Sequence, residues 1–182
     1  MEGGIHAWNG WVAKGAPEAG MAHFEPASRV EDLIALAWLL EEGSRKFYGE
    51  IPGRMKDLPT QNLFHSLGTA EERHKETLLA TYLKTVKIPS DPKFPGSVIS
   101  NLPPEDYMEG GIRLKAAVEW AKGSSPKEIL EFSIAQEVNA QDLYLKMERA
   151  MGDPQAVKIF RSLAEEEKSH LDRLTVLLDK NL

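Results

Sequence analysis

The chain has 182 residues, a net charge of −6, an isoelectric point near 5.4 and no cysteine. This length suits one domain with an appendage, and the acidic balance, without a dense cluster of Lys and Arg, argues against nucleic acid as a partner. No apolar run has membrane-spanning length and no signal peptide is recognisable, so we expect a cytoplasmic protein and no membrane contact. Without cysteine, a bound metal must be held by nitrogen and oxygen atoms.

Residues 1–27 show neither a helical nor a strand period, and we interpret them as an arm or linker before a single domain of residues 28–182. From Ser28 to about Glu50, apolar residues recur at helical spacing, and the same spacing continues from Thr60 to about Val86. The connection between these two segments is short. It therefore predicts an antiparallel helical hairpin.

A long crossover follows, in which five prolines between residues 86 and 107 exclude a long helix. A short helix is predicted from about Ile112 to Lys122. The next helix should begin at Ser125, because Ser125, Pro126 and Glu128 form the pattern of a capping box, and it should end near Gly152. A last helix is predicted from about Pro154 to Asp179. The prediction is an all-α four-helix bundle of two hairpins joined by this crossover.

An internal repeat relates the two hairpins. A shift of 96 residues places Glu41 on Glu137 and carries the Glu-x-x-His motif of the first hairpin onto that of the second. The full set of matched polar residues is Glu41 with Glu137, Tyr48 with Tyr144, Glu71 with Glu167, and His74 with His170. A single Glu-x-x-His pair would be weak support for a site, whereas two pairs at equivalent positions are hard to attribute to chance. We expect an approximate two-fold axis between the hairpins.

The spacing of these residues suits a metal centre. Residues three apart lie side by side on a helix, so Glu71 and His74 can approach one ion from the same face. Packing the hairpins together would gather four carboxylates and two imidazoles, whose negative charge must be neutralised inside the bundle. Two divalent cations would do so, and this donor set suits iron, manganese or zinc.

The arrangement resembles that of the ferritin-like di-iron carboxylate proteins. Within this group the chain is similar to the rubrerythrins, whose first and third helices carry a glutamate seven residues before a tyrosine, as in "EEGSRKFY" and "EVNAQDLY". The resemblance covers about residues 28–180. It implies two iron ions, with bridging roles for Glu71 and Glu167 and hydrogen bonds from Tyr48 and Tyr144 to ligand carboxylates. The implied ligands are Glu41, Glu71, His74, Glu137, Glu167 and His170, and no catalytic residue is expected beyond them.

Two features depart from the rubrerythrin pattern. Rubrerythrins often add a cysteine-ligated rubredoxin domain, so the resemblance here implies an external electron donor such as a rubredoxin-like protein. They also carry a further glutamate one turn after the third-helix ligand, where this chain has Ala140, and we expect a symmetric site with six ligands. The implied activity is an oxidoreductase of peroxidase or ferroxidase type, connected with oxidative stress, that reduces peroxide or dioxygen and can oxidise ferrous iron. Ferritin-like bundles commonly dimerise, so we expect a homodimer.

Alternatives remain at two points. The sequence "MEGGIHAWNGW" resembles the end of a rhodanese-like domain, but it equally suits an arm that docks Trp8 and Trp11 on a partner. The bundle itself fits either an enzyme or a non-catalytic module, in which a structural metal stabilises the helices for metal binding or protein interaction. The paired motifs favour the enzyme. His65 lies off the ligand stripe, and its repeat equivalent is Arg161, so we expect no metal role for it.

Overall fold

The computed structural model of the protein describes residues 29–99 and 105–180. Nearly all of this part is helical, in α1 (Val30–Glu50), α2 (Leu58–Val86), α3 (Leu114–Gly123), α4 (Pro126–Ala150) and α5 (Pro154–Lys180). The shorter elements are η3 (Pro52–Arg54), β1 (Tyr107–Met108), η4 (Glu109–Gly111) and β2 (Ile112–Arg113). None of the described helices is both long and apolar enough to cross a membrane. The arm predicted for residues 1–27 lies outside the described residues.

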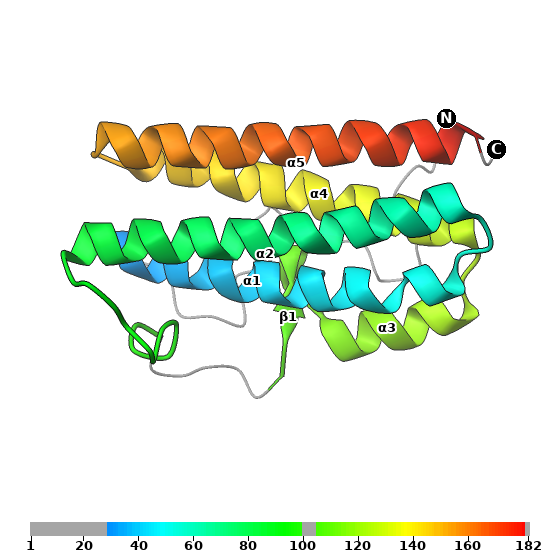
Figure 1. The fold of residues 1–182 in the computed structure, drawn as a ribbon, viewed down its shortest axis with the longest axis horizontal. Coiled ribbons are helices and arrows are strands. Elements are labelled where there is room, and N and C mark those ends of the chain that lie inside the picture. The colour runs from blue at the N-terminus through cyan, green and yellow to red at the C-terminus, as the bar shows by residue number, and fades with distance from the viewer. Residues whose placement is uncertain (1–28, 100–104, 181–182) are drawn as a thin grey trace.

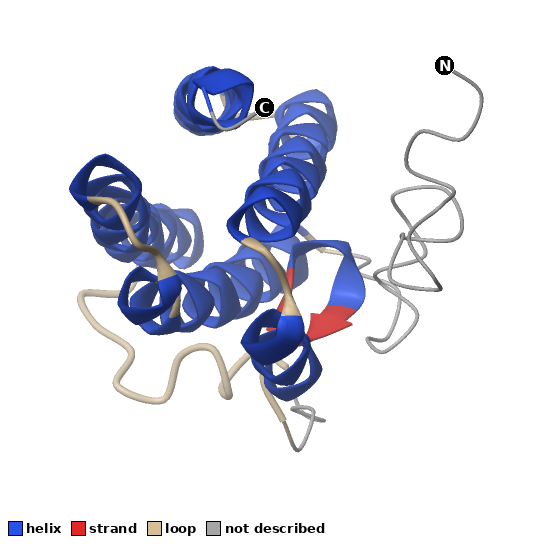
Figure 2. Cartoon of the chain, turned by 90° about the vertical axis from the view of Figure 1, so that its right-hand side faces the viewer, coloured by secondary structure: helices blue, strands red, loops and turns tan. Residues whose placement is uncertain are grey.

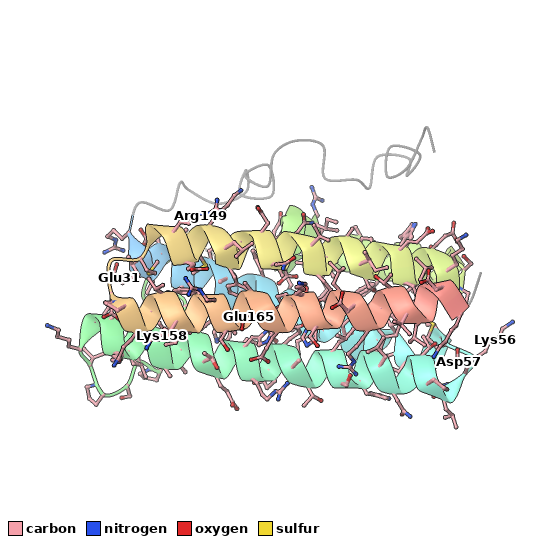
Figure 3. The ribbon with its side chains drawn as sticks, turned by 90° about the horizontal axis from the view of Figure 1, so that it is seen from above. Glu31, Lys56, Asp57, Arg149, Lys158 and Glu165 are labelled. Atoms are coloured by element: carbon pink, nitrogen blue, oxygen red, sulfur yellow. The ribbon has the colours of Figure 1, made fainter. Side chains whose placement is uncertain are left out.

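The long helices form two antiparallel hairpins, as the sequence predicts. In Figure 1, α4 and α5 lie above α1 and α2, and Figure 2 shows the hairpins around a common centre. The two turns lie at opposite ends of the bundle. In Figure 3, Lys56 and Asp57 mark the α1–α2 end, whereas Arg149 and Lys158 lie near the other end. This opposition is what an approximate two-fold axis between the hairpins requires, and the predicted all-α four-helix bundle is confirmed.

Helix starts follow the expected chemistry. The Ser125 side chain accepts a hydrogen bond from the Glu128 backbone N–H at 3.3 Å, and the Glu128 carboxylate accepts from the Ser125 N–H at 2.7 Å. The predicted capping box is thus present at the start of α4. Asp57 caps α2 by accepting a hydrogen bond from the Thr60 N–H at 2.8 Å. This cap starts α2 at Leu58, two residues before the predicted start at Thr60.

The crossover differs from the prediction in one respect. A two-stranded antiparallel sheet pairs Tyr107 with Arg113 and Met108 with Ile112. The predicted helix from Ile112 is therefore wrong for its first two residues, because they belong to β2, and α3 begins only at Leu114. The small sheet packs on the bundle beside α1 (Figure 1), and the Tyr107 and Met108 side chains are buried there.

Aromatic and aliphatic side chains fill the bundle on both sides of its centre. One cluster includes Phe47, Phe64 and Phe132, and a second includes Ile34, Tyr82 and Phe160. Because the two apolar clusters exclude water from the helix interfaces, polar side chains placed between them lie in a low-dielectric environment. The position between the clusters is where the charged residues of the repeat are found.

Candidate metal centre

The structure brings all six predicted ligand residues together at the centre of the bundle. Each hairpin contributes a glutamate from its first helix and a Glu-x-x-His pair from its second, and no member of the set is more than 5% exposed. The set comprises Glu41 on α1, Glu71 and His74 on α2, Glu137 on α4, and Glu167 and His170 on α5. Charged residues are almost never buried to this degree without a partner or a metal.

The polar atoms form two overlapping groups, in each of which the ligand atoms lie within 4.8 Å of one another. One group contains Glu41 and His74, and the other contains Glu137 and His170. Glu71 and Glu167 belong to both groups. Each group thus has its own glutamate and histidine, and the two groups share two carboxylates.

Distances around His74 show how closely the donors converge. Its Nδ1 lies 2.8 Å from an oxygen of Glu167, 3.1 Å from one of Glu71 and 3.5 Å from one of Glu41. In the second group, His170 Nδ1 lies 3.1 Å from Glu167 and 3.3 Å from Glu137. The two imidazole rings are stacked, with their centroids 5.7 Å apart.

Several of these buried atoms have no hydrogen-bond partner. One oxygen each of Glu41, Glu71 and Glu167 and both ring nitrogens of His74 have no partner in hydrogen-bond geometry, although His74 Nδ1 lies only 2.8 Å from Glu167. An unpaired buried polar atom costs about 1–3 kcal/mol, so atoms that converge without bonding one another call for an additional binding partner. Carboxylate oxygens and imidazole nitrogens are ligands for iron, manganese and zinc, and the residues present therefore fit a bound metal.

The pKa values of the buried carboxyl groups also favour a bound cation at this position. Burial raises the pKa of Glu71 well above its usual value, and the charges of Glu41 and Glu167 raise it further. Burial also raises the pKa of Glu167, an effect that contact with His74 opposes and the charge of Glu137 reinforces. Without a cation, this environment favours the protonated, neutral form of both carboxyl groups. A divalent ion would bind in place of those protons.

Glu41 and His74 behave as an ion pair across the first hairpin. Burial alone would raise the pKa of Glu41, but the charge of His74 together with hydrogen bonds to Glu41 outweighs burial and lowers the pKa. Conversely, burial would lower the pKa of His74, and the Glu41 charge raises it. The pKa of His170 is also raised, because contact with Glu137 outweighs its burial. In the metal-free state the protonated form of both histidines is therefore favoured, and a metal ion would compete with those protons.

The tyrosines connect the hairpins. Tyr48 on α1 donates a hydrogen bond to Glu137 on α4, and Tyr144 on α4 donates one to Glu41 on α1. Both rings are fully buried, and burial raises the pKa of each phenol well above its usual value, so both hydroxyls keep their protons. Each glutamate is thus oriented by the opposite hairpin.

A further buried carboxylate, Glu109, was not predicted. It lies on η4 in the crossover, accepts a hydrogen bond from the Ser44 hydroxyl and is 4% exposed. Burial, followed by the charge of Glu41, raises its pKa to about 8. Sequence periodicity could not find this residue because the crossover has none. The Gly-Gly pair that follows it was the one available signal of a tight turn.

A surface hollow of about 370 Å³ lies between α1 and α2, over Tyr48. It is lined by Arg45, Tyr48, Gly49, Phe64, His65, Gly68, Thr69 and Glu72. His65 is exposed here and lies outside both groups of ligand atoms. In the repeat, Gly49 corresponds to Leu145 and Gly68 to Ala164, so the second hairpin carries larger side chains at these positions. The hollow thus breaks the internal symmetry next to Tyr48.

The fold and site define an all-α, ferritin-like bundle with a buried carboxylate and histidine cluster. The family model for rubrerythrin matches residues 128–181, which form most of α4 and α5 and include Glu137, Glu167 and His170. The resemblance to rubrerythrins is therefore confirmed over the second hairpin, and the match supports iron binding in broad terms.

A solved structure shows the same fold. It is a hypothetical protein from Pyrococcus furiosus, 20% identical, with a TM-score of 0.61 over 84% of this chain and 89% of that chain. At this identity the likeness extends to the fold alone. No curated protein matches the sequence.

Proposed function

We propose that this protein is a non-haem di-iron oxidoreductase that reduces hydrogen peroxide or dioxygen and oxidises ferrous iron in doing so. The observation that carries the proposal is the pair of overlapping ligand groups that share Glu71 and Glu167. Two equivalent groups of donors with shared carboxylates suit two adjacent ions of one kind. The rubrerythrin match favours iron as that ion.

The residues have distinct roles in this proposal. Glu41 and His74 would hold one ion, Glu137 and His170 the other, and Glu71 and Glu167 would bridge the two. When bound, a diferrous pair supplies the two electrons that, with two protons, convert one hydrogen peroxide into two waters. The protein excludes bulk water from this position because the surrounding side chains are buried.

The tyrosines act through the glutamates. A carboxylate fixed by a hydrogen bond from the opposite hairpin keeps its orientation when the charge at the centre changes. The hydroxyls of Tyr48 and Tyr144 therefore position Glu137 and Glu41 rather than touching the ions. This is the role that the resemblance to rubrerythrins implies for the two tyrosines, which hydrogen-bond to ligand carboxylates without binding the metal.

The oxidant needs a way into the buried centre, and the hollow over Tyr48 is the place we propose for it. Tyr48 lines this hollow and also a small enclosed pocket that includes Glu71 and Glu137. One side chain thus separates the surface from the ligand carboxylates. A small neutral molecule such as hydrogen peroxide or dioxygen is suited to pass when that side chain moves.

Electrons must return to the centre after each turnover. The 182-residue sequence contains no cysteine and hence no thiolate redox site, so we propose an external donor such as a rubredoxin-like protein. We also propose that the protein works as a homodimer, because helical bundles of this class commonly pair.

The test is to measure metal content and absorption together. Protein purified without chelator should hold about two irons per chain, and peroxide added to the ferrous form should produce an oxo-bridged ferric absorption that a reductant removes. The E71A/E167A double variant, which lacks both shared carboxylates, is the control and should show neither. Stoichiometric zinc that ferrous iron cannot replace would contradict the proposal and leave a structural metal module.

A further inference from the structure

Glu109 is a buried carboxylate at the metal centre that belongs to neither hairpin. It lies in the crossover, on the tight turn η4 between β1 and β2. The hydrogen bond from Ser44 attaches it to α1. Within the described residues no lysine or arginine is paired with it. A carboxylate so placed calls for a cation or a further donor.

The backbone is built to bring Glu109 to this position. A Cβ on Gly43 of α1 would lie 2.0 Å from the Tyr107 carbonyl oxygen, so only glycine lets β1 approach α1 this closely. Gly110 and Gly111 adopt φ of 72° and 69°, the left-handed region that favours glycine. A Cβ on Gly110 would also lie 2.6 Å from the Asn139 side chain of α4. These glycines thus allow the turn η4 to pack closely between α1 and α4.

The turn closes a small enclosed pocket on the α1–α4 side of the centre. Its lining residues are Ser44, Tyr48, Glu71, Glu109, Gln136, Glu137 and Ala140. Gln136 is 2% exposed, yet neither its amide oxygen nor its amide nitrogen has a hydrogen-bond partner. A buried amide with both groups unpaired indicates that the side chains around it lack a polar partner in this arrangement. Two predicted ligands, Glu71 and Glu137, face the same pocket.

The internal repeat shows where Glu109 lies relative to the two ions. Ser44 and Ala140 are equivalent positions of the repeat, 96 residues apart, and both line the pocket with Glu109. A side chain between equivalent positions of the two hairpins lies near their approximate two-fold axis. Glu109 is therefore placed to serve both ions, while the six residues of the repeat serve them from the four helices.

We propose that Glu109 is a further carboxylate of the metal centre, which binds the metal pair from the α1–α4 side. The inference rests on the proposed function, because it assumes the pair. Neither group of converging ligand atoms includes Glu109 as it stands, so its side chain must rotate from Ser44 toward the ions when they bind. The path of that rotation is short, because Glu109 lines the same small pocket as the ligand residues Glu71 and Glu137.

The negative charge of Glu109 would affect the redox balance of the iron pair. Four carboxylates balance two divalent ions, whereas a fifth adds a negative charge that two trivalent ions balance better. Glu109 would therefore stabilise the oxidised pair relative to the reduced pair. Removing its charge should shift the midpoint potential of the iron pair upward.

The experiment is a cobalt(II) titration of chelator-treated full-length protein, with the wild type compared with E109Q, E109D and E105Q. Cobalt(II) absorption reports affinity, stoichiometry and coordination number at once. E105Q is the matched control, because Glu105 is in the same crossover but is about one-third exposed and pairs with Arg113. Circular dichroism of each variant establishes that the bundle is folded.

We expect E109Q to bind cobalt(II) about 10-fold more weakly than the wild type. Its visible bands should change shape, E109D should recover part of the affinity, and E105Q should match the wild type. E109Q with wild-type affinity and bands would overturn the role of Glu109 while leaving the proposed function intact. Wild-type protein that binds no cobalt(II) or ferrous iron would overturn both.

Discussion

Tyr48 and Tyr144 exchange partners across the bundle, because each donates its hydrogen bond to the glutamate that precedes the other tyrosine by seven residues. Tyr48 thus supports Glu137 rather than Glu41 of its own helix. The exchange couples the hairpins directly at the metal centre. Any loss of packing between the hairpins will be felt by the glutamates of both groups.

This exchange predicts that each tyrosine variant affects the opposite half of the site. Y48F removes the tyrosine hydrogen bond to Glu137 and should weaken the binding of the ion held by Glu137 and His170 by about 10-fold. Y144F should weaken the ion held by Glu41 and His74 to the same degree. A calorimetric titration with two binding steps separates these effects. Y82F is the control, because Tyr82 donates to Asp91 at 2.9 Å, away from the centre. Equal weakening of both steps by Y48F would contradict the prediction.

Because Glu71 and Glu167 belong to both groups of ligand atoms, we expect different variants to bind different numbers of metal ions. E41A and E137A each remove a ligand from one group only, so each variant should retain about one ion per chain. E71A and E167A each remove a ligand from both groups, so each should retain less than one. Elemental analysis after dialysis against ferrous or cobalt(II) ions measures this. One ion retained by all four variants would mean that neither carboxylate bridges.

The pKa of Glu109 predicts how the stability of the metal-free protein depends on pH. Folding raises this pKa from its usual 4.5 to about 8, so the folded state favours the protonated form. The contribution of Glu109 to stability is therefore complete below about pH 4.5 and is lost as the pH rises through about 8. E109Q stays neutral throughout and lacks this loss.

Thermal unfolding of chelator-treated protein tests whether the contribution of Glu109 to stability is lost as the pH rises. At pH 5 the wild type and E109Q should melt at similar temperatures, and at pH 8.5 E109Q should melt higher. The difference between the two proteins cancels the contributions of the other buried carboxyl and imidazole groups, which both proteins share. Melting curves that stay parallel from pH 5 to pH 8.5 would show that Glu109 is not buried as a neutral acid.

Much of the bundle was predictable because its signals are local and repeated. Apolar spacing and the Ser125 cap located the helices to within a few residues, and the 96-residue repeat paired the six residues that the structure brings together. The exchange of tyrosine partners was not predictable, because helical spacing shows which residues share a face but not which hairpin each side chain reaches. That information depends on packing between residues that are 89 and 103 positions apart in the sequence.

Glu109 shows the other limit of sequence reading. Its place in the core depends on the absence of a side chain at Gly43, far away in the sequence, and on the backbone conformation of Gly110 and Gly111. From sequence alone, a glycine within a helix indicates only a position of low helix propensity. Only the structure shows that the crossover approaches α1 at this position.

That close approach predicts opposite effects for two glycine variants on α1. G43A places a methyl group against the Tyr107 carbonyl and should destabilise the protein by roughly 1–3 kcal/mol, as overpacking does. G49A adds a methyl group where no atom lies within 4 Å and should be neutral or stabilise by up to about 1 kcal/mol. Urea unfolding of the metal-free proteins measures both. A stable G43A would mean that the crossover can move away from α1 at little cost.

The hollow over Tyr48 predicts a variant that slows the oxidant without disturbing the metals. G49L/G68A gives the first hairpin the side chains that the second has at Leu145 and Ala164. Added Cβ atoms at both positions meet at most ordinary contacts, so the variant should fold and bind iron as the wild type does. Because the larger side chains fill the hollow, stopped-flow oxidation of the ferrous protein should be several-fold slower with hydrogen peroxide and slower still with a bulky alkyl hydroperoxide.

The comparison between hydrogen peroxide and the bulky hydroperoxide distinguishes slower entry of the oxidant from a slower reaction at the metals. A change in the metals would slow both oxidants alike, whereas a narrowed approach discriminates by size. G123L is the control, because Gly123 on α3 also has open space around it but lies outside the hollow. If G49L/G68A oxidises at the wild-type rate with both peroxides, the oxidant reaches the centre by another side of the bundle. In that case the α1–α4 side, where the crossover covers Glu109, would be the next to block.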